Sequence, residues 1–159
     1  MKFVADEMLG KLAKWLRIMG IDVEYENPFP DDLLLKKGTK ENRVILTRDR
    51  KILNKKNLPE CVLIEDDYPY DQLIYLLRRY DIAPLERAFS RCIGCNCELK
   101  DISREEIEGR VPPYVFATQK EYRICPGCGK VYWAGTHRER MEAMLKELKE
   151  KTRHFTAEK

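Results

Sequence analysis

Three short apolar runs in the first half of the sequence lead into acidic residues. Residues 2–5 are followed by Asp6, residues 44–47 lead to Asp49, and residues 61–64 are followed by three consecutive acids. Short apolar runs of this kind are typical of buried strands in a parallel sheet, and such sheets bind their ligands where the strands end. We therefore expect Asp6 and Asp49 to emerge together at the carboxyl edge of one sheet.

A carboxylate cluster at this edge could hold a divalent cation against a phosphate. Asp31 stands at the start of a helix pattern, and a helix that connects parallel strands begins at the same edge. Mg²⁺ and Mn²⁺ take oxygen ligands and keep several waters, which suits a few carboxylates and a substrate phosphate. Such a site can hydrolyse phosphodiesters by activating water. The candidate ligands are Asp6, Asp31 and Asp49, followed by Asp32 and Asp66.

Most of these acids also have a simpler interpretation. Asp31 could serve only as a helix N-cap, and Asp49 could serve only to stabilise a turn. Asp6 is harder to explain in this way because it follows a buried strand directly. Glu7 and the acids at 65–67 compete with the candidates for the same role.

Five basic residues could contact phosphate beside these acids. The first three form a row at a spacing of three on one helix face, and the other two flank the second strand-end acid. Contact with a phosphate backbone is one interpretation of the row, but an ordinary solvated helix face is the better one. The flanking arginines are better placed to bind phosphate or to pair with the acids. These residues are Lys11, Lys14, Arg17, Arg48 and Arg50.

Two Cys-x-x-Cys pairs in the last third of the chain predict a zinc site. A gap of two residues lets one tight turn present two thiolates to the metal, and four thiolates complete a tetrahedral, structural site. Free or redox-active thiols are the alternative. Cys97 is interpreted as a spare thiol that could replace a neighbour, and His137 as a residue outside the site. The expected zinc ligands are Cys92, Cys95, Cys125 and Cys128.

The predicted helices and strands that position these residues alternate in the first half of the chain, and short strands follow in the second half. We expect strands at 2–5, 21–25, 44–47 and 61–64, helices at 6–19, 31–42 and 70–79, and a helical turn or two at 51–57. This alternation predicts an α/β fold with a parallel sheet flanked by helices. After residues 82–85 we expect short strands at 114–117, 121–124 and 130–133, an insertion at about 101–112, and a C-terminal helix.

Length and composition exclude some classes of protein. A chain of 159 residues suits one ordinary domain or two small ones. It contains no apolar run long enough to span a membrane, and its first residues have no apolar signal core. We therefore expect a cytoplasmic protein with no membrane partner, in which paired cysteines favour metal over disulfide. The net charge of +3 is too small to indicate a nucleic-acid partner by itself.

Four stretches of the sequence are distinctive in combination. They are residues 5–17 (ADEMLGKLAKWLR), 46–49 (LTRD), 90–96 (SRCIGCN) and 131–137 (VYWAGTH). Together they resemble the family named for the C-terminal RNase domain of the mut-seven exonuclease. That family joins a PIN-like nuclease domain to a zinc ribbon, and the resemblance extends to about residue 141. It implies a PIN-like domain at 1–86 and a zinc ribbon with a C-terminal helix at 87–159.

The resemblance implies a metal-dependent ribonuclease that uses Mg²⁺ or Mn²⁺, with a structural zinc ion. Asp6 matches the first acid of the PIN pattern and Asp49 the later strand-end acid. Asp31 matches the middle acid best because a small residue, Gly38, follows seven positions later, while Asp32 stays open. Cys97 is extra to the family pattern, and a fourth acid has no unambiguous match.

Two other functions fit parts of the sequence. A signalling receiver also places acids after its strands, but no lysine directly follows a final strand here and a zinc ribbon would be unusual. A non-catalytic RNA- or ribosome-binding protein would use the ribbon for binding, and the acids only for folding. Cleavage of labelled RNA separates the ribonuclease from both alternatives.

Overall fold

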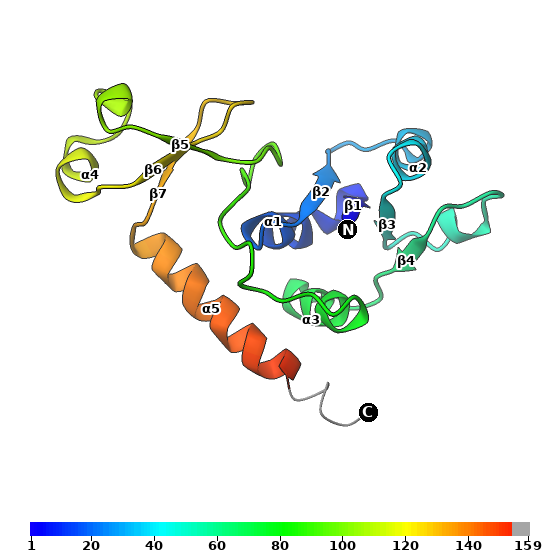
Figure 1. Ribbon diagram of the computed structural model, residues 1–159. Helices are drawn as coiled ribbons and strands as arrows, with labels where there is room; N and C mark the ends of the chain where they lie inside the picture. The colour runs from blue at the N-terminus through cyan, green and yellow to red at the C-terminus, as the bar shows by residue number, and fades with distance from the viewer. Residues whose placement is uncertain (154–159) are drawn as a thin grey trace.

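The computed structural model describes residues 1–153, and their first part is a parallel sheet. Its four strands lie in the order β2-β1-β3-β4, and every neighbouring pair is parallel. Helices flank this sheet, so the expected α/β class is confirmed (Figure 1). The elements are β1 (Lys2–Ala5), the 3-10 turn η1 (Glu7–Leu9), α1 (Gly10–Ile18), β2 (Asp22–Tyr25), α2 (Asp31–Lys40), β3 (Val44–Thr47), η2 (Ile52–Asn54), β4 (Cys61–Leu63) and α3 (Pro69–Arg79).

Apolar side chains cover both faces of this sheet, as its uninterrupted apolar runs predict. On one face, Phe3 and Ala5 of β1 lie in the larger core, to which α1 and α3 also contribute. On the other face, Val4 and Ile45 pack with Leu34 of α2. Because side chains alternate along a strand, β1 and β3 serve both cores and are almost entirely buried.

The strand ends lie where the sequence predicts them. β1 and β3 have the expected bounds, and Ala5 pairs with Leu46. The backbone N–H of Asp6 then donates to the carbonyl oxygen of Leu46 at 3.0 Å. Asp6 therefore leaves β1 directly beside the end of β3, at the carboxyl edge of the sheet.

The first helix differs in detail from the expected span of 6–19. It is divided into η1 and α1, because the Asp6 side chain accepts a hydrogen bond from the Met8 N–H and holds the chain in a 3-10 turn. The helix stops at Gly20, as expected, where φ is +78°. A Cβ atom at this glycine would lie 2.1 Å from the carbonyl oxygen of Arg87, so the chain after α3 packs closely against the turn.

The second part of the chain forms an antiparallel sheet of three short strands in the order β5-β6-β7. A long helix, α5, follows the last strand and returns along the first part of the molecule (Figure 1). The elements are β5 (Lys100–Ile102), the 3-10 turn η3 (Glu105–Ile107), α4 (Pro113–Thr118), β6 (Tyr122–Ile124), β7 (Val131–Trp133) and α5 (Thr136–Arg153).

The strand expected at 114–117 is wrong, because these residues belong to helix α4. Their aromatic and β-branched types favour a strand, but Pro113 begins a helix at its first position. The hydroxyl of Tyr122 lies 3.0 Å from the carbonyl oxygen of Val115 and 3.1 Å from that of Gln119, so it satisfies carbonyl groups at the helix end. Tertiary contacts therefore override the local β preference.

The insertion in this sheet lies between β5 and β6, at residues 103–121, later than the expected 101–112. It opens with a capping box, in which the Ser103 hydroxyl lies 2.8 Å from the Glu106 carboxylate. Ile107, Val115 and Tyr122 form a small core of their own. The insertion is therefore an ordered unit that covers one side of the small sheet.

Helix α5 fastens the second part to the first. Leu145 and Leu148 have no exposed surface and lie in the core of the parallel sheet. The hydroxyl of Tyr70, on α3, lies 3.4 Å from the Glu147 carboxylate. The boundary between two domains at residue 86 stays a prediction. Helix α5 lies after that boundary in the chain, but it packs into the core of the part before it. Across residues 1–153, no helix has the length and apolar character needed to span a membrane.

Candidate functional site

Asp6 is held by three hydrogen bonds at the end of β1. Its Oδ1 accepts from the Met8 N–H at 2.9 Å, and its Oδ2 accepts from the Thr47 hydroxyl at 2.6 Å and from the Arg48 N–H at 2.7 Å. The residue is only 5 % exposed. A carboxylate can accept about four hydrogen bonds, so one acceptor position is left for a ligand. The side chain is oriented before anything binds.

Thr47 joins the two strand-end acids. Its buried hydroxyl donates to Asp6 and accepts from the backbone N–H of Asp49 at 2.9 Å. One Asp49 oxygen also accepts from the Lys51 N–H at 2.8 Å, which is the hydrogen bond of an Asx turn. Asp49 therefore has the turn role considered for it, and its backbone N–H is joined to Asp6 through Thr47. The importance of Thr47 was missed in the sequence, where its only sign was a threonine two residues before the acid.

Asp31 and Asp32 begin helix α2 at the same edge, but they contact a different partner. Pro30 is the N-cap, and Asp31 makes no capping hydrogen bond, so the interpretation of Asp31 as the cap is wrong. The ammonium group of Lys55 lies 3.3 Å from an Asp31 oxygen and 3.8 Å from an Asp32 oxygen. Asp32 is fully exposed, whereas the Asp31 side chain is 49 % exposed. Lys55 had no role in the sequence interpretation.

The acids do not form a compact cluster in this structure. Within residues 1–153, the four cysteines are the only set of three or more candidate metal ligands whose ligand atoms all lie within 4.8 Å of one another. Asp66 contributes its backbone carbonyl to a hydrogen bond from Gln72 at 2.8 Å. Like charges repel, so carboxylates that converge on one edge stay apart until a cation reduces the repulsion.

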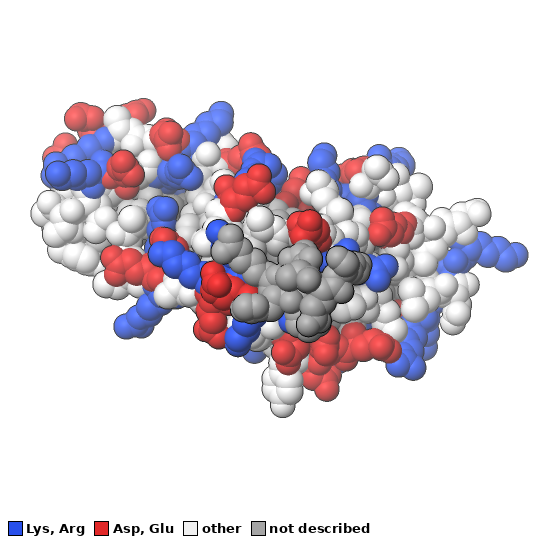
Figure 2. Space-filling view, turned by 60° about the horizontal axis from the view of Figure 1, so that its bottom comes forward, with Lys and Arg blue, Asp and Glu red and all other residues white. Residues whose placement is uncertain are grey.

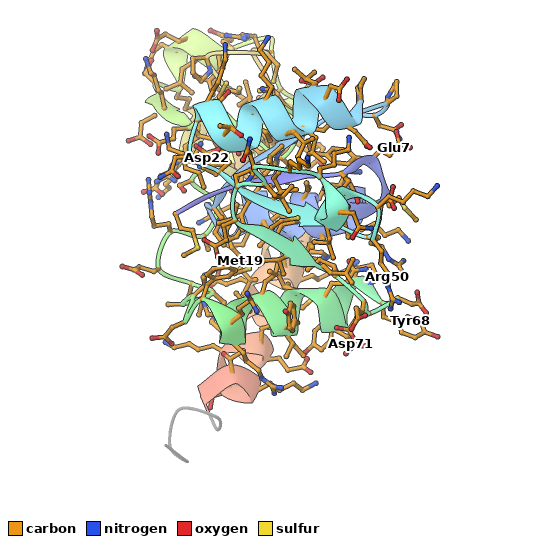
Figure 3. The ribbon with its side chains drawn as sticks, turned by 90° about the vertical axis from the view of Figure 1, so that its right-hand side faces the viewer. Glu7, Met19, Asp22, Arg50, Tyr68 and Asp71 are labelled. Carbon is orange, nitrogen blue, oxygen red and sulfur yellow. The ribbon has the colours of Figure 1, made fainter. Side chains whose placement is uncertain are left out.

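The arginines beside Asp49 pair with the acids that follow β4. Arg48 forms an ion pair with Asp67, and Arg50 lies 2.9 Å from Glu65, with 79 % of its side chain exposed. Figure 3 shows Glu7, Arg50 and Tyr68 at one end of the molecule and Asp22, the first residue of β2, toward the other. The carboxyl edge therefore carries acidic and basic side chains together.

Of the three basic residues on the first helix, Lys11 and Lys14 are exposed and Arg17 is not. Arg17 is 4 % exposed, and its guanidinium donates to the carbonyl oxygens of Val23, Ile93 and Gly94 at 2.7–3.1 Å. Burial lowers the pKa of Arg17, while neighbouring acids and cysteines oppose that shift. The expectation that Arg17 binds RNA is wrong. On the face seen in Figure 2, basic and acidic side chains are intermingled.

The four cysteines that the sequence predicts as zinc ligands come together in the structure. Cys92 and Cys128 place their sulfur atoms 3.6 Å apart, and those of Cys95 and Cys125 are 3.1 Å apart. Thiolates bound to one zinc ion at about 2.3 Å would be about 3.8 Å apart. The observed separations, all below 4.8 Å, fit this geometry. The four residues can therefore hold a zinc ion with little movement.

Tyr132 and the backbone prepare one of these thiols for metal binding. The Tyr132 hydroxyl lies 3.1 Å from the sulfur of Cys92 and accepts from the Ile93 N–H at 3.2 Å. Burial by itself would raise the pKa of Cys92, but hydrogen bonds from Tyr132 and from the backbone of Cys95 and Gly94 lower it to about 6. The thiolate is the form that binds zinc. Tyr132 therefore contacts a candidate zinc ligand directly.

Asn96 ties the first cysteine turn to the edge strand β2. Its side-chain oxygen accepts from the Val23 N–H at 3.1 Å, and its amide nitrogen donates to Asp22 at 2.8 Å. Because β2 is the outermost strand, this N–H has no strand partner on that side, and Asn96 supplies one. Arg17 reaches the same turn from α1. The candidate metal centre is therefore bonded to the parallel sheet.

The remaining candidates stand outside the four-cysteine set. The sulfur of Cys97 lies beside Gly127, where a Cβ atom would approach it to 2.8 Å, but it is not part of the set. His137 is exposed and is also outside it.

The fold and the sites define an α/β protein with an acidic sheet edge and a four-cysteine candidate metal centre. The model of one family, described as Mut7-C RNAse domain, matches residues 1–145. The chain belongs to this family, and the family description indicates a ribonuclease role with RNA as the substrate. No curated protein and no solved structure matches the chain.

Proposed function

We propose that this protein is a metal-dependent ribonuclease of the PIN type, which hydrolyses RNA phosphodiester bonds at the carboxyl edge of the parallel sheet. The observation that supports the proposal is the bridge through Thr47, whose hydroxyl donates to the Asp6 carboxylate and accepts from the backbone N–H of Asp49. Paired strand-end carboxylates on a rigid support are what binding of Mg²⁺ or Mn²⁺ against a phosphate requires.

Asp6, Asp31 and Asp49 are the proposed ligands of the catalytic cation, with Asp32 and Asp66 as further candidates. All offer hard oxygen atoms, which suit Mg²⁺ or Mn²⁺. When bound, the cation would supply an activated water and stabilise the leaving oxygen. Asp6 contributes a fixed acceptor, and one Asp49 oxygen accepts no hydrogen bond from residues 1–153. Asp31 must first part from Lys55, whose ammonium is then free to pair with a substrate phosphate.

The remaining basic residues have proposed roles in holding the RNA. Lys11 and Lys14 are exposed on α1 and can follow the backbone, while Arg48 and Arg50 lie beside Asp49 and can exchange their carboxylate partners for phosphate. The proposed zinc ion has a structural role, and the ribbon would assist RNA binding. We also propose a cytoplasmic location, because close thiols stay reduced there.

RNA cleavage tests this function directly. Purified protein is incubated with labelled RNAs in the presence of Mn²⁺ or Mg²⁺, and the products are resolved on a gel. Asp6→Asn and Asp49→Asn should each lower the rate by at least about 100-fold, because loss of a direct ligand should exceed the 10- to 100-fold effect of losing an outer partner. The control is Asp101→Asn, an exposed acid on β5 that pairs with Arg123.

Other results would favour the alternative functions. Binding of several RNAs without cleavage under any metal would support a non-catalytic RNA- or ribosome-binding protein. Phosphorylation of Asp49 by acetyl phosphate would support a receiver. Equal activity of the wild type, Asp6→Asn and Asp49→Asn would remove these acids from the proposed site.

A further inference from the structure

Exposed apolar side chains occur in the segments that follow the strands at the acidic edge. Among residues 1–153, six large hydrophobic side chains are exposed: Met1, Met8, Leu53, Tyr68, Tyr75 and Tyr114. Three of the six, Met8, Leu53 and Tyr68, lie in the segments that follow β1, β3 and β4. Single exposed apolar residues need no explanation, but three around one strand edge indicate a contact surface.

Tyr68 stands out because the fold makes no use of its side chain. Of the eight tyrosines in the sequence, six place their hydroxyl within hydrogen-bonding distance of another residue: Tyr25, Tyr70, Tyr75, Tyr80, Tyr122 and Tyr132. In the described part of the chain, Tyr68 and Tyr114 have no such contact and no ring contact. They are also the most exposed tyrosines, at 73 % and 70 %.

The backbone that carries Tyr68 is firmly held. Tyr68 is the N-cap of α3, and the following Pro69 restricts it to the extended conformation it has, with φ −90° and ψ 127°. Its carbonyl accepts from the Gln72 N–H at 3.0 Å, and the buried Gln72 side chain donates to the carbonyl of Asp66 at 2.8 Å. A tyrosine on a fixed backbone has only two side-chain torsions to order when it binds, so the entropy cost is small.

A short series of contacts links this tyrosine to the strand-end acid Asp6. Asp67, the residue before Tyr68, pairs with Arg48, and the Arg48 N–H donates to the Asp6 carboxylate at 2.7 Å. Arg50 extends from the same edge, as Figure 3 shows. The edge therefore combines the exposed ring of Tyr68, the exposed guanidinium of Arg50 and the proposed metal ligands. The ring suits an RNA base, the guanidinium suits a phosphate, and the metal ligands suit the bond to be cleaved.

We propose that Tyr68 is the base-stacking residue of the acidic edge, and that the RNA segment it holds is unpaired. The inference rests on the proposed ribonuclease function and adds the form of its substrate. A base can stack on a tyrosine only if its face is free, whereas paired bases in an A-form duplex cover each other and its grooves expose only base edges. Met8, across the edge, provides a second apolar contact for the same segment.

The test uses short RNAs that carry one 2-aminopurine, whose fluorescence falls when it stacks. Binding is measured without added Mg²⁺ or Mn²⁺, and cleavage is measured with Mn²⁺. Tyr68→Ala should remove the quenching and weaken binding by roughly 5- to 100-fold, the usual effect of losing one stacked base. Tyr68→Phe keeps the ring and should stay within about twofold of the wild type. Tyr114→Ala, equally exposed but on the ribbon insertion, should leave the quenching unchanged.

The outcomes separate this inference from the ribonuclease proposal. If Tyr68→Ala quenches and binds like the wild type, the inference is overturned even when cleavage is intact. A duplex of the same sequence that is bound and cleaved as well as the single strand would also overturn it. If the wild type stacks a base through Tyr68 but cleaves nothing, the inference stands and the ribonuclease proposal fails. Thermal melting of each variant verifies that the exposed substitutions leave the fold intact.

Discussion

The two candidate metal sites of this protein differ in how complete they are before a metal binds. The four cysteine sulfurs already lie within 4.8 Å of one another, whereas the acids at the sheet edge stand farther apart and pair with basic side chains. Thiols can approach closely because a protonated thiol can donate to a neighbouring thiolate: the hydrogen bond with Cys125 raises the pKa of Cys95, and hydrogen bonds lower that of Cys92. Ionised carboxylates have no proton to share and repel one another. The comparison teaches that a fold can preassemble ligands that share protons and can only bring fully charged ones near.

Of the variants that test this difference between the two sites, loss of one cysteine should have the largest effect on the protein. Cys125→Ser removes a buried ligand from the closed set. Structural zinc contributes about 10–16 kcal/mol to the folding of small zinc domains, so the ribbon should lose its metal and unfold. Metal content and limited proteolysis measure both effects.

Cys97→Ser is the matched control for this variant. It removes a neighbouring thiol that lies outside the set, and it should retain the zinc ion and the wild-type melting temperature. A Cys125→Ser protein that also kept both would show that the ligands are wrongly assigned. Loss of zinc in Cys97→Ser would show that this thiol belongs to the site.

Breaking the hydrogen bonds that connect the parallel-sheet part to the first cysteine turn should have the next largest effect, on stability. Arg17→Met removes donors from three carbonyl oxygens, of which two lie in the first cysteine turn. A buried carbonyl left without a partner costs about 1–3 kcal/mol, and since only the Val23 hydrogen bond is buried while those to Ile93 and Gly94 are partly buried, stability should fall by about 2–4 kcal/mol. Denaturant unfolding measures this loss.

RNA binding by Arg17→Met tests whether the Arg17 guanidinium contacts phosphate. The salt dependence of binding should not change, because the guanidinium is buried. Lys14→Gln, on the exposed face of the same helix, should leave stability unchanged and reduce the salt slope by about one. If Arg17→Met instead reduced the salt slope at unchanged stability, the residue would be a phosphate contact after all.

At the acidic edge, Thr47→Val tests whether the two strand-end acids act as one unit. The variant keeps the side-chain shape and removes the hydroxyl that joins Asp6 to the Asp49 backbone. Activity should fall by about 10- to 100-fold, the usual effect of losing a partner that orients a metal ligand. Thr47→Ser restores the hydroxyl and should restore most of the rate. Failure of serine to rescue would mean that the bridge does not position the acids.

Much of the fold could be predicted because its strands are short, apolar and bounded by acids. β1 and β3 have the predicted bounds, and the rule that parallel strands end at one edge placed Asp6 beside β3. The cysteine pairs were equally clear, because two residues of separation is the spacing of a metal-binding turn. These features depend on local sequence patterns, which a single sequence contains.

The errors occurred where a contact joins residues far apart in the chain. Arg17 looks like the third member of a solvated basic row, but its partner Gly94 lies 77 residues away. Asn96 reaches β2 across 73 residues. No local pattern predicts such partners. The error at 114–117 is of another kind, because the helix there depends on Pro113 and on the hydroxyl of Tyr122, which lies near in the chain, while the strand-forming residue types were given more weight.

The smallest expected effect concerns Lys55, whose ammonium group pairs with the acids at the start of α2. The ammonium of Lys55 is closer to Asp31 than to Asp32, at 3.3 Å against 3.8 Å, and a metal ion bound to Asp31 must displace it. Exposed ion pairs are worth about 0.2–1 kcal/mol, so Lys55→Gln should lower the half-saturating concentration of Mn²⁺ by no more than about fivefold. Manganese binding followed by electron paramagnetic resonance measures the change, with Lys56→Gln as the neighbouring control. Because the displaced lysine is also the proposed partner of a substrate phosphate, the variant should in addition bind RNA less tightly. Unchanged metal affinity in Lys55→Gln would remove Asp31 from the ligand set and leave Asp6 and Asp49 to bind the cation with another acid.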